Sequence, residues 1–202
     1  MAKATKEKRD LLRVRLIDIA ERHVREDGIA SLRARALAAE AECAVGAIYN
    51  VFEDMTGLIL AVNGRTFRAL GSFVTDRVAA AKDDPTEQLI AMATGYLDFA
   101  HQNPMLWRAL FDVEMSTLAK VPEWYLDELS RLFGIIAKPL ATLNPTADAE
   151  SLDLMTRALF SSIHGIVLLG LENRISGVPQ DRLSGMIEFI LRNAASGPRA
   201  DG

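Results

Sequence analysis

The side chains that could perform catalysis are few and scattered along the chain. No two of the histidines, His23, His101 and His164, have the i, i+4 spacing of a helical metal site. The single cysteine, Cys43, has no evident base nearby, and the sequence contains no Glu-x-x-His pair of a carboxylate metal centre. Val45-Gly46-Ala47 is not a phosphate-binding loop. These patterns predict no enzyme, no metal and no cofactor, with an all-helical enzyme as the remote alternative.

Residues 15–58 carry a pattern suited to binding a polymer. A helical stretch ends at Asp27-Gly28, a second follows, and a tight turn leads into a very short third stretch that ends in Tyr49-x-x-Phe52. This order of elements is that of a helix-turn-helix, in which the last helix enters the DNA major groove. The chemistry indicated here is recognition of double-stranded DNA.

Composition and charge agree with a folded protein in which the positive charge is concentrated near one end of the chain. The chain has 202 residues, is 50% hydrophobic and 25% charged, and carries a net charge of −4. Positive residues gather at the N-terminus, namely Lys3, Lys6, Lys8, Arg9, Arg13 and Arg15. One cysteine excludes an intrachain disulfide, and charges interrupt the apolar stretches, so we expect a soluble cytoplasmic protein without a membrane partner.

The elements that must position these residues are helices. Apolar residues recur at three- and four-residue spacing, and no stretch alternates with a period of two. We therefore expect an all-α fold of nine helices, at about 5–27, 32–41, 45–49, 56–81, 85–102, 105–118, 122–143, 144–173 and 180–194. The expected divisions are 1–55 for a DNA-binding domain, 56–195 for ligand binding and dimerisation, and 196–202 for a flexible tail.

The pattern resembles the TetR family of transcriptional regulators. Tyr49-x-x-Phe52 after Gly46 is the most specific part of this likeness. Farther along, Ile163-His164-Gly165 is similar to the TetR C-terminal type named after its Trp-His-Gly motif, with Ile163 in place of the Trp. The resemblance implies a homodimer that binds a palindromic operator, with repression as the expected sign, and that a small molecule releases from DNA.

Carrying the resemblance over position by position gives a set of expected DNA-binding residues. Tyr49 is expected to meet a phosphate, Val45 and Ala47 to touch thymine methyl groups, and Phe52 to pack the three helices together. The full set is Arg33, Arg35, Ala44, Val45, Ala47, Tyr49, Asn50 and Met55.

Some positions depart from the family pattern. Glu42-Cys43-Ala44 replaces the usual Gly-Val-Ser, so that Ala44 lacks the hydroxyl that caps the helix and bonds a phosphate. Val51 and Met55 also differ from the usual residues. Two interpretations stay open: the chain binds DNA through a more apolar helix, or it is a sensor of the same fold that acts on a partner.

A second set of residues has the character of a ligand site. Aromatic and Met side chains in the second half favour a mostly apolar cavity for an apolar or amphipathic effector. The expected residues are Phe99, Trp107, Phe111, Met115, Trp124 and His164. Core packing is the alternative for each, and His164 could instead be a structural histidine bonded to another helix.

The last two expected helices carry wide apolar stripes. Such helices from two subunits can form a four-helix bundle, so we expect a homodimer through them. Gly165 and Gly170 weaken a helix, and they are tolerated where another backbone comes close.

Overall fold

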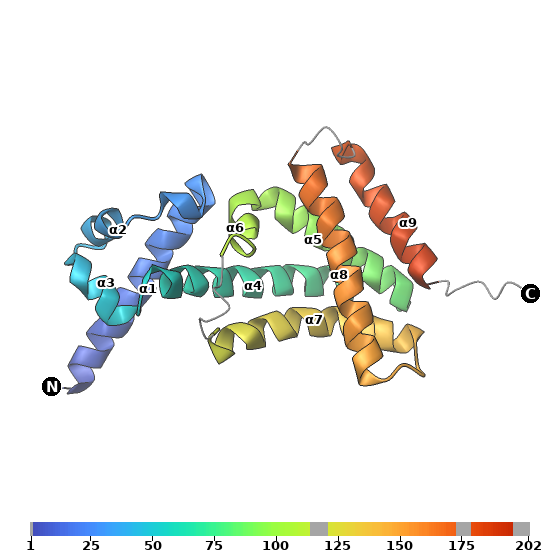
Figure 1. The fold of residues 1–202 in the computed structure, drawn as a ribbon, viewed down its shortest axis with the longest axis horizontal. Coiled ribbons are helices and arrows are strands. Elements are labelled where there is room, and N and C mark those ends of the chain that lie inside the picture. Colours follow the sequence, from blue (N-terminus) through green and yellow to red (C-terminus); the bar gives the residue numbers. More distant parts are fainter. Residues whose placement is uncertain (1, 114–120, 173–178, 196–202) are drawn as a thin grey trace, which may run out of the picture. The chain divides into compact units, whose positions relative to one another are not determined.

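The computed structural model describes residues 2–113, 121–172 and 179–195 (Figure 1). Within these ranges the chain forms nine α-helices, two short 3-10 helices and no strand, which confirms the all-α prediction. The α-helices are α1 (Ala2–Asp27), α2 (Ala34–Glu40), α3 (Val45–Val51), α4 (Met55–Ala79), α5 (Pro85–Gln102), α6 (Pro104–Ala109), α7 (Glu123–Leu143), α8 (Ala149–Leu171) and α9 (Leu183–Ala195). The expected tail at 196–202 lies outside the described residues.

Several helix boundaries differ from expectation for local reasons. α2 begins at Ala34 rather than at 32, because Arg33 has extended backbone (φ −130°, ψ 120°) after a 3-10 turn. α6 ends at Ala109, well before the expected 118. α8 begins later than Asn144, since the Asp148 carboxylate accepts a hydrogen bond of 2.8 Å from the Ser151 amide and caps the helix. α7 runs through Pro139 to its end.

The chain divides into two compact units. The first comprises Met1–Arg68 with Asn103–Leu126, and the second Ala69–Gln102 with Asp127–Gly202. Helices α4 and α7 contribute residues to both units. The expected functional division at residue 55 stays a prediction.

The core of the first unit follows from the helical spacing of its apolar residues. Leu16, Ala20 and Val24 lie four apart on α1 and are fully buried. They share one cluster with the fully buried Leu37 of α2 and Ile48 of α3. This cluster fixes the three N-terminal helices as one body.

Gly28 ends α1 as predicted. Its φ of +76° lies in the region that suits glycine, and its amide donates to the Val24 carbonyl at 2.9 Å. The chain can then turn toward α2 without leaving the last carbonyls of α1 unpaired.

The second unit is held by packing of α9 against α5 and α8. Leu183, Ile187 and Leu191 of α9 are buried, and Gly170 of α8 gives Leu183 room. A Cβ atom added at Gly170 would lie 2.4 Å from Leu183 Cδ2. Close helix contact therefore explains this glycine.

α8 is also the most apolar long helix that the structure describes. By length and composition it could cross a membrane, with a mean hydropathy of 1.5 over its best window, of which 22% is buried. The pair α3 and α4, bent by 62°, passes the same test only if counted as one span. Core helices of soluble proteins pass it as well, so the finding is weak evidence for a membrane.

Candidate DNA-binding surface and ligand site

The short helix α3 presents one face to solvent and the other to the core. Ile48 is fully buried and Phe52, which follows the helix, is 3% exposed, so the prediction that Phe52 packs the helices together is confirmed. Val45 and Tyr49, four residues apart, are 37% and 47% exposed. Apolar and amphipathic side chains on such a face are available to a partner.

The other predicted DNA-binding residues lie in different environments. Ala44, Asn50 and Arg35 are exposed, and Ala47 is half-buried. The Arg33 side chain donates to the backbone carbonyls of Ala30 and Leu32, at 2.6 and 3.1 Å. Met55 is half-buried and packs against the core of the first unit.

The turn between α2 and α3 is conformationally unusual. Glu42 has a φ of +52°, the left-handed region that disfavours every residue with a Cβ except Asn and Asp. Its carboxylate, 79% exposed, lies 3.4 Å from the Arg15 guanidinium of α1. Ala44 begins α3 without a side-chain cap, as its residue type predicts. The start of α3 thus carries a negative charge in place of a hydroxyl.

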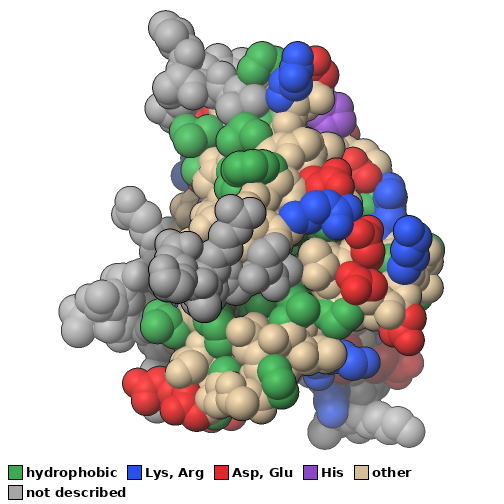
Figure 2. All heavy atoms as spheres, turned by 90° about the vertical axis from the view of Figure 1, so that its right-hand side faces the viewer, with side chains coloured by type: hydrophobic (Ala, Val, Ile, Leu, Met, Phe, Trp, Pro, Cys, Tyr) green, Lys and Arg blue, Asp and Glu red, His purple; other side chains and the backbone are tan. Residues whose placement is uncertain are grey.

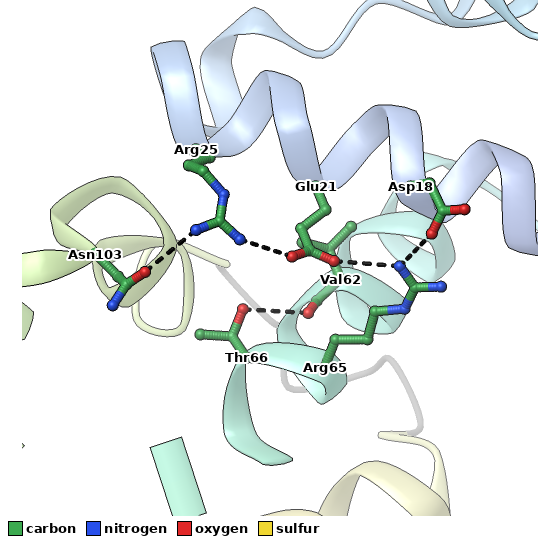
Figure 3. A network of polar contacts seen from close by, with 7 residues as sticks. All are labelled: Asp18, Glu21, Arg25, Val62, Arg65, Thr66 and Asn103. Atoms are coloured by element: carbon green, nitrogen blue, oxygen red, sulfur yellow. Dashed lines mark hydrogen bonds and ion pairs between the residues drawn. The ribbon is translucent and has the colours of Figure 1, made fainter. Parts of the chain in front are cut away.

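A polar network joins helices within the first unit (Figure 3). Arg65 of α4 donates to Asp18 at 2.5 Å and to Glu21 at 3.2 Å, both on α1. Arg25 then bridges Glu21, at 2.9 Å, and Asn103, at 3.3 Å, just before α6. Burial acts to lower the pKa of Arg65, and the bonds and charges of the two carboxylates outweigh it, so its pKa is raised. The network links α1, α4 and the start of α6.

Three of the predicted ligand-site residues belong to the first unit. Trp107 is 1% exposed and meets Phe111 edge to face, with ring centroids 5.5 Å apart. Phe111 and Trp124 are exposed. The indole of Trp124 covers Gly64 of α4 so closely that a Cβ there would lie 2.8 Å from its ring.

The expected set of ligand-site residues leaves out two polar residues beside these aromatic rings. Asn63 is fully buried in α4, and its amide donates to the Ala109 carbonyl at 2.7 Å. Tyr125 is buried next to Trp124; burial raises the pKa of its hydroxyl, partly offset by a hydrogen bond with Asn63. The available signal was Asn63-Gly64, a turn-type dipeptide, in the middle of an apolar helical stretch.

The second unit holds two further predicted ligand-site residues. Phe99 is buried and meets Phe73 edge to face at 5.9 Å. His164 of α8 shares a hydrogen bond of 2.8 Å between its Nδ1 and the Tyr96 hydroxyl of α5, and it stacks on Phe160 at 5.6 Å. Burial lowers the pKa of His164. This bond to another helix fits the structural alternative for His164, and Met115 lies outside the described residues.

A cavity of about 80 Å³ lies elsewhere in the second unit. It is lined by Leu89, Leu140, Leu143, Asn144, Leu159, Leu191 and Ala194, none of which belongs to the predicted ligand set. The described residues contain no group of three His, Cys, Asp or Glu side chains that could hold a metal ion. Cys43 is half-buried and packs against the core.

Large apolar side chains stay exposed on α8 and α9. Leu154 and Leu169 of α8 and Phe189 of α9 are 68%, 45% and 69% exposed. Figure 2 shows one face of the molecule on which hydrophobic side chains lie open beside a band of charged ones. Exposed apolar residues of this size mark a surface that a partner can cover.

Comparisons with known proteins relate this architecture to a protein family. Residues 89–193 match the family model described as "Tetracyclin repressor-like, C-terminal domain". The transcriptional repressor KstR of Mycobacterium tuberculosis is 30% identical over 138 residues, which cover 67% of this chain and 61% of KstR. The match thus spans less than two thirds of that relative.

Solved structures agree on the fold. A protein from Rhodococcus sp. RHA1 has a TM-score of 0.73 at 20% identity, with 91% of this chain and 94% of that chain covered. RolR, solved in complex with resorcinol, has a TM-score of 0.67 at 22% identity, with 95% and 96% covered. At these identities the likeness concerns the fold alone.

The matched family model covers more than half of the chain, and the predicted helix-turn-helix precedes it. The proteins of this family are transcriptional regulators and not enzymes, as the absence of catalytic patterns predicted. The predicted Trp-His-Gly subtype stays a prediction. The chain therefore belongs to the TetR family of transcriptional regulators.

Proposed function

We propose that the protein is a cytoplasmic, homodimeric repressor that binds a palindromic operator and leaves it when a small molecule binds. The observation that carries this proposal is the exposed face of α3, on which Val45 and Tyr49 stay open to solvent although Ile48 of the same helix is fully buried.

The mode of DNA binding follows from the chemistry of this face. Val45 presents methyl groups that can contact thymine, while Tyr49 and Asn50 offer hydrogen bonds to phosphate or base edges. Lys8 and Arg9, exposed on the first turns of α1, add positive charge. Such a surface favours operators rich in A·T pairs.

The dimer is supported by the exposed apolar residues of α8 and α9. Two copies that pair these helices would bury the exposed parts of Leu154, Leu169 and Phe189, which are 45–69% exposed, so each gains roughly half of the 1.5–3 kcal/mol that burial of a fully exposed side chain provides. Pairing also supplies the second recognition helix that a palindromic site requires. It offers one explanation for the high hydropathy of α8.

The effector is expected to be small and apolar or amphipathic. The aromatic group around Trp107, within the first unit, supplies apolar walls with few polar tips. RolR, which shares the fold, was solved with the small phenol resorcinol. The ligand shifts the dimer between two shapes only if it binds one of them more tightly.

A direct test is selection of genomic DNA fragments by the purified protein, followed by titration of the retained fragments at several salt concentrations. Tyr49→Ala should weaken binding on all sequences about equally and leave the salt slope nearly unchanged, because it removes an uncharged contact to phosphate. Tyr49→Phe, which keeps the ring, should behave like Tyr49→Ala. Unchanged affinity in both variants would remove Tyr49 from the phosphate contacts.

The dimer has its own test in sedimentation. Phe189→Gln should weaken self-association at least tenfold, whereas Leu11→Gln, at an equally exposed position on α1, should leave it unchanged. A wild-type protein that stays monomeric at micromolar concentration would refute the dimer.

A second candidate function is a sensor of the same fold that acts through a protein partner. The carboxylate of Glu42 at the start of α3 favours it, since it repels phosphates. This alternative would be supported if the purified protein retained no genomic DNA fragment, either alone or with small molecules extracted from cells.

A further inference from the structure

Two poor helix formers stand side by side in the middle of α4. Asn63 and Gly64 follow the apolar run Leu58–Val62, where Ala or Leu would stabilise the helix better. Gly64 is explained by the Trp124 indole that covers it. Asn63 needs a separate explanation, because its side chain is fully buried.

Half of the Asn63 amide is satisfied inside the protein. Its Nδ2 donates to the carbonyl of Ala109, the last residue of α6. The hydrogen bond between Asn63 and the Tyr125 hydroxyl lowers the Tyr125 pKa, as a bond donated by the amide N–H does, so the Oδ1 stays buried without a partner in the described part of the chain. A buried acceptor left unpaired is costly and rare, and it calls for a ligand or water.

Aromatic side chains lie beside Asn63. Tyr125, from the first turn of α7, lies beside Asn63 and meets Phe67 edge to face at 5.3 Å. Trp124 meets Tyr125 at 5.6 Å. Since burial raises the pKa of the Tyr125 hydroxyl, it is neutral at physiological pH and can both donate and accept.

We infer that Asn63 and Tyr125 form the polar end of the effector site, and that they select an uncharged ligand bearing a hydroxyl on an apolar ring. This rests on the proposed ligand response and adds the ligand class. The ligand hydroxyl donates to Asn63 Oδ1 and accepts from the Tyr125 hydroxyl. A carboxylate or phosphate is disfavoured, because it would face the amide oxygen and lose its hydration.

The same contact gives the ligand a route to the DNA-binding helices. Asn63 already joins α4 to the end of α6, and Arg25 and Arg65 join α1 to the same two elements (Figure 3). A ligand that hydrogen-bonds to the Asn63 amide therefore acts on α4 and on the end of α6, and both of these helices are joined to α1. The whole connection lies within the first unit.

The chain provides its own reporter for the test. Its only two tryptophans are Trp107 and Trp124, both in the first unit. Their fluorescence, excited at the red edge of the indole band, is followed while phenol, toluene or benzoate is added to the full-length protein. Phenol and toluene have nearly the same shape, so their difference isolates the hydroxyl.

We expect saturable binding of phenol, at least tenfold tighter than toluene, with benzoate weaker than phenol. Tyr125→Phe keeps the ring and should remove most of the preference for phenol, and Asn63→Leu should abolish it. Thr66→Val is the matched control: it removes a buried hydroxyl of α4 that donates to the helix's own Val62 carbonyl, and it should leave the preference intact.

Equal binding of phenol and toluene, or no saturable signal with phenol, would overturn the inference. So would a preference for phenol that survives Tyr125→Phe, a variant that leaves the hydrogen bond from Asn63 to the Ala109 carbonyl in place. Operator binding is measured separately without phenol, so that loss of DNA binding refutes the proposed function while the fluorescence result still decides the site.

Discussion

Replacing Glu42 by glycine should stabilise the protein. A residue with a Cβ atom in the left-handed region costs about 1–2 kcal/mol, and glycine removes this cost. Glycine also lowers the stability by about 0.4–1 kcal/mol, because it increases the entropy of the unfolded chain. The ion pair with Arg15 is largely exposed and contributes close to nothing. The net expectation is a gain of about 0.5–1 kcal/mol.

Thermal or urea unfolding of three variants separates conformation from charge. Glu42→Gly should raise the free energy of unfolding, whereas Glu42→Ala, which keeps the backbone cost, should not. Glu42→Asn should lie between them, because Asn tolerates this region better than other residues. If Glu42→Ala stabilises as much as Glu42→Gly, the carboxylate rather than the backbone is the source of strain.

The same position should affect DNA binding through its charge. Glu42→Gln keeps the backbone and releases Arg15 from its partner, 3.4 Å away. If Arg15 then meets a phosphate, the slope of log affinity against log salt becomes steeper by about one. An unchanged slope would show that Arg15 does not reach DNA.

Three other expectations concern the packing and the protonation of single residues. Gly170→Ala should lower the free energy of unfolding by about 1–3 kcal/mol in thermal unfolding, because its Cβ would meet buried Leu183 at 2.4 Å. Gly165→Ala, with open space around its Cβ, should be neutral or stabilising. Equal effects of the two variants would refute the close contact. Because burial lowers the pKa of His164 in the folded protein, the unfolded chain binds the proton more readily; the stability this residue contributes is present above about pH 6.5 and is lost as pH falls through the lowered pKa. Unfolding curves at a series of pH values should show this slope in the wild type and not in His164→Phe. Trp107→Ala should cost about 3–5 kcal/mol and compromise folding rather than ligand response alone, since the side chain is 1% exposed, and a near-native unfolding temperature would contradict this.

The fold could be predicted where local chemistry and helical spacing agree. Gly28 ends α1 because its backbone can adopt positive φ, and Ile48 and Phe52 are buried because they lie on the inner side of a very short helix. Each of these signals is contained within a few residues. Tertiary contacts then confirm what the local pattern favours.

Boundaries were less predictable where two neighbouring signals compete. Asn144-Pro145 is a plausible helix start, and Asp148 nearby is another; the hydrogen bond to Ser151 decides for Asp148. Arg33 fits a helical pattern, yet its side chain bonds the carbonyls of the preceding turn and its backbone is extended.

The candidate site was harder to predict, because it depends on contacts between distant segments. The aromatic type of Trp107 does not reveal its nearly complete burial. Asn63 and Tyr125 are 62 positions apart, and only the fold brings the amide of one to the hydroxyl of the other. The mid-helix Asn-Gly pair was the one local sign that something unusual occurs there.

The central claim is that α3 reads DNA as one half of a symmetric dimer. Hydroxyl-radical footprinting of a fragment retained by the protein tests it most directly. We predict two protected half-sites related by two-fold symmetry, about 34–36 Å apart or a multiple of that spacing, with protection lost in Tyr49→Ala at the same protein concentration. A single asymmetric footprint, or identical protection by Tyr49→Ala, would contradict the account.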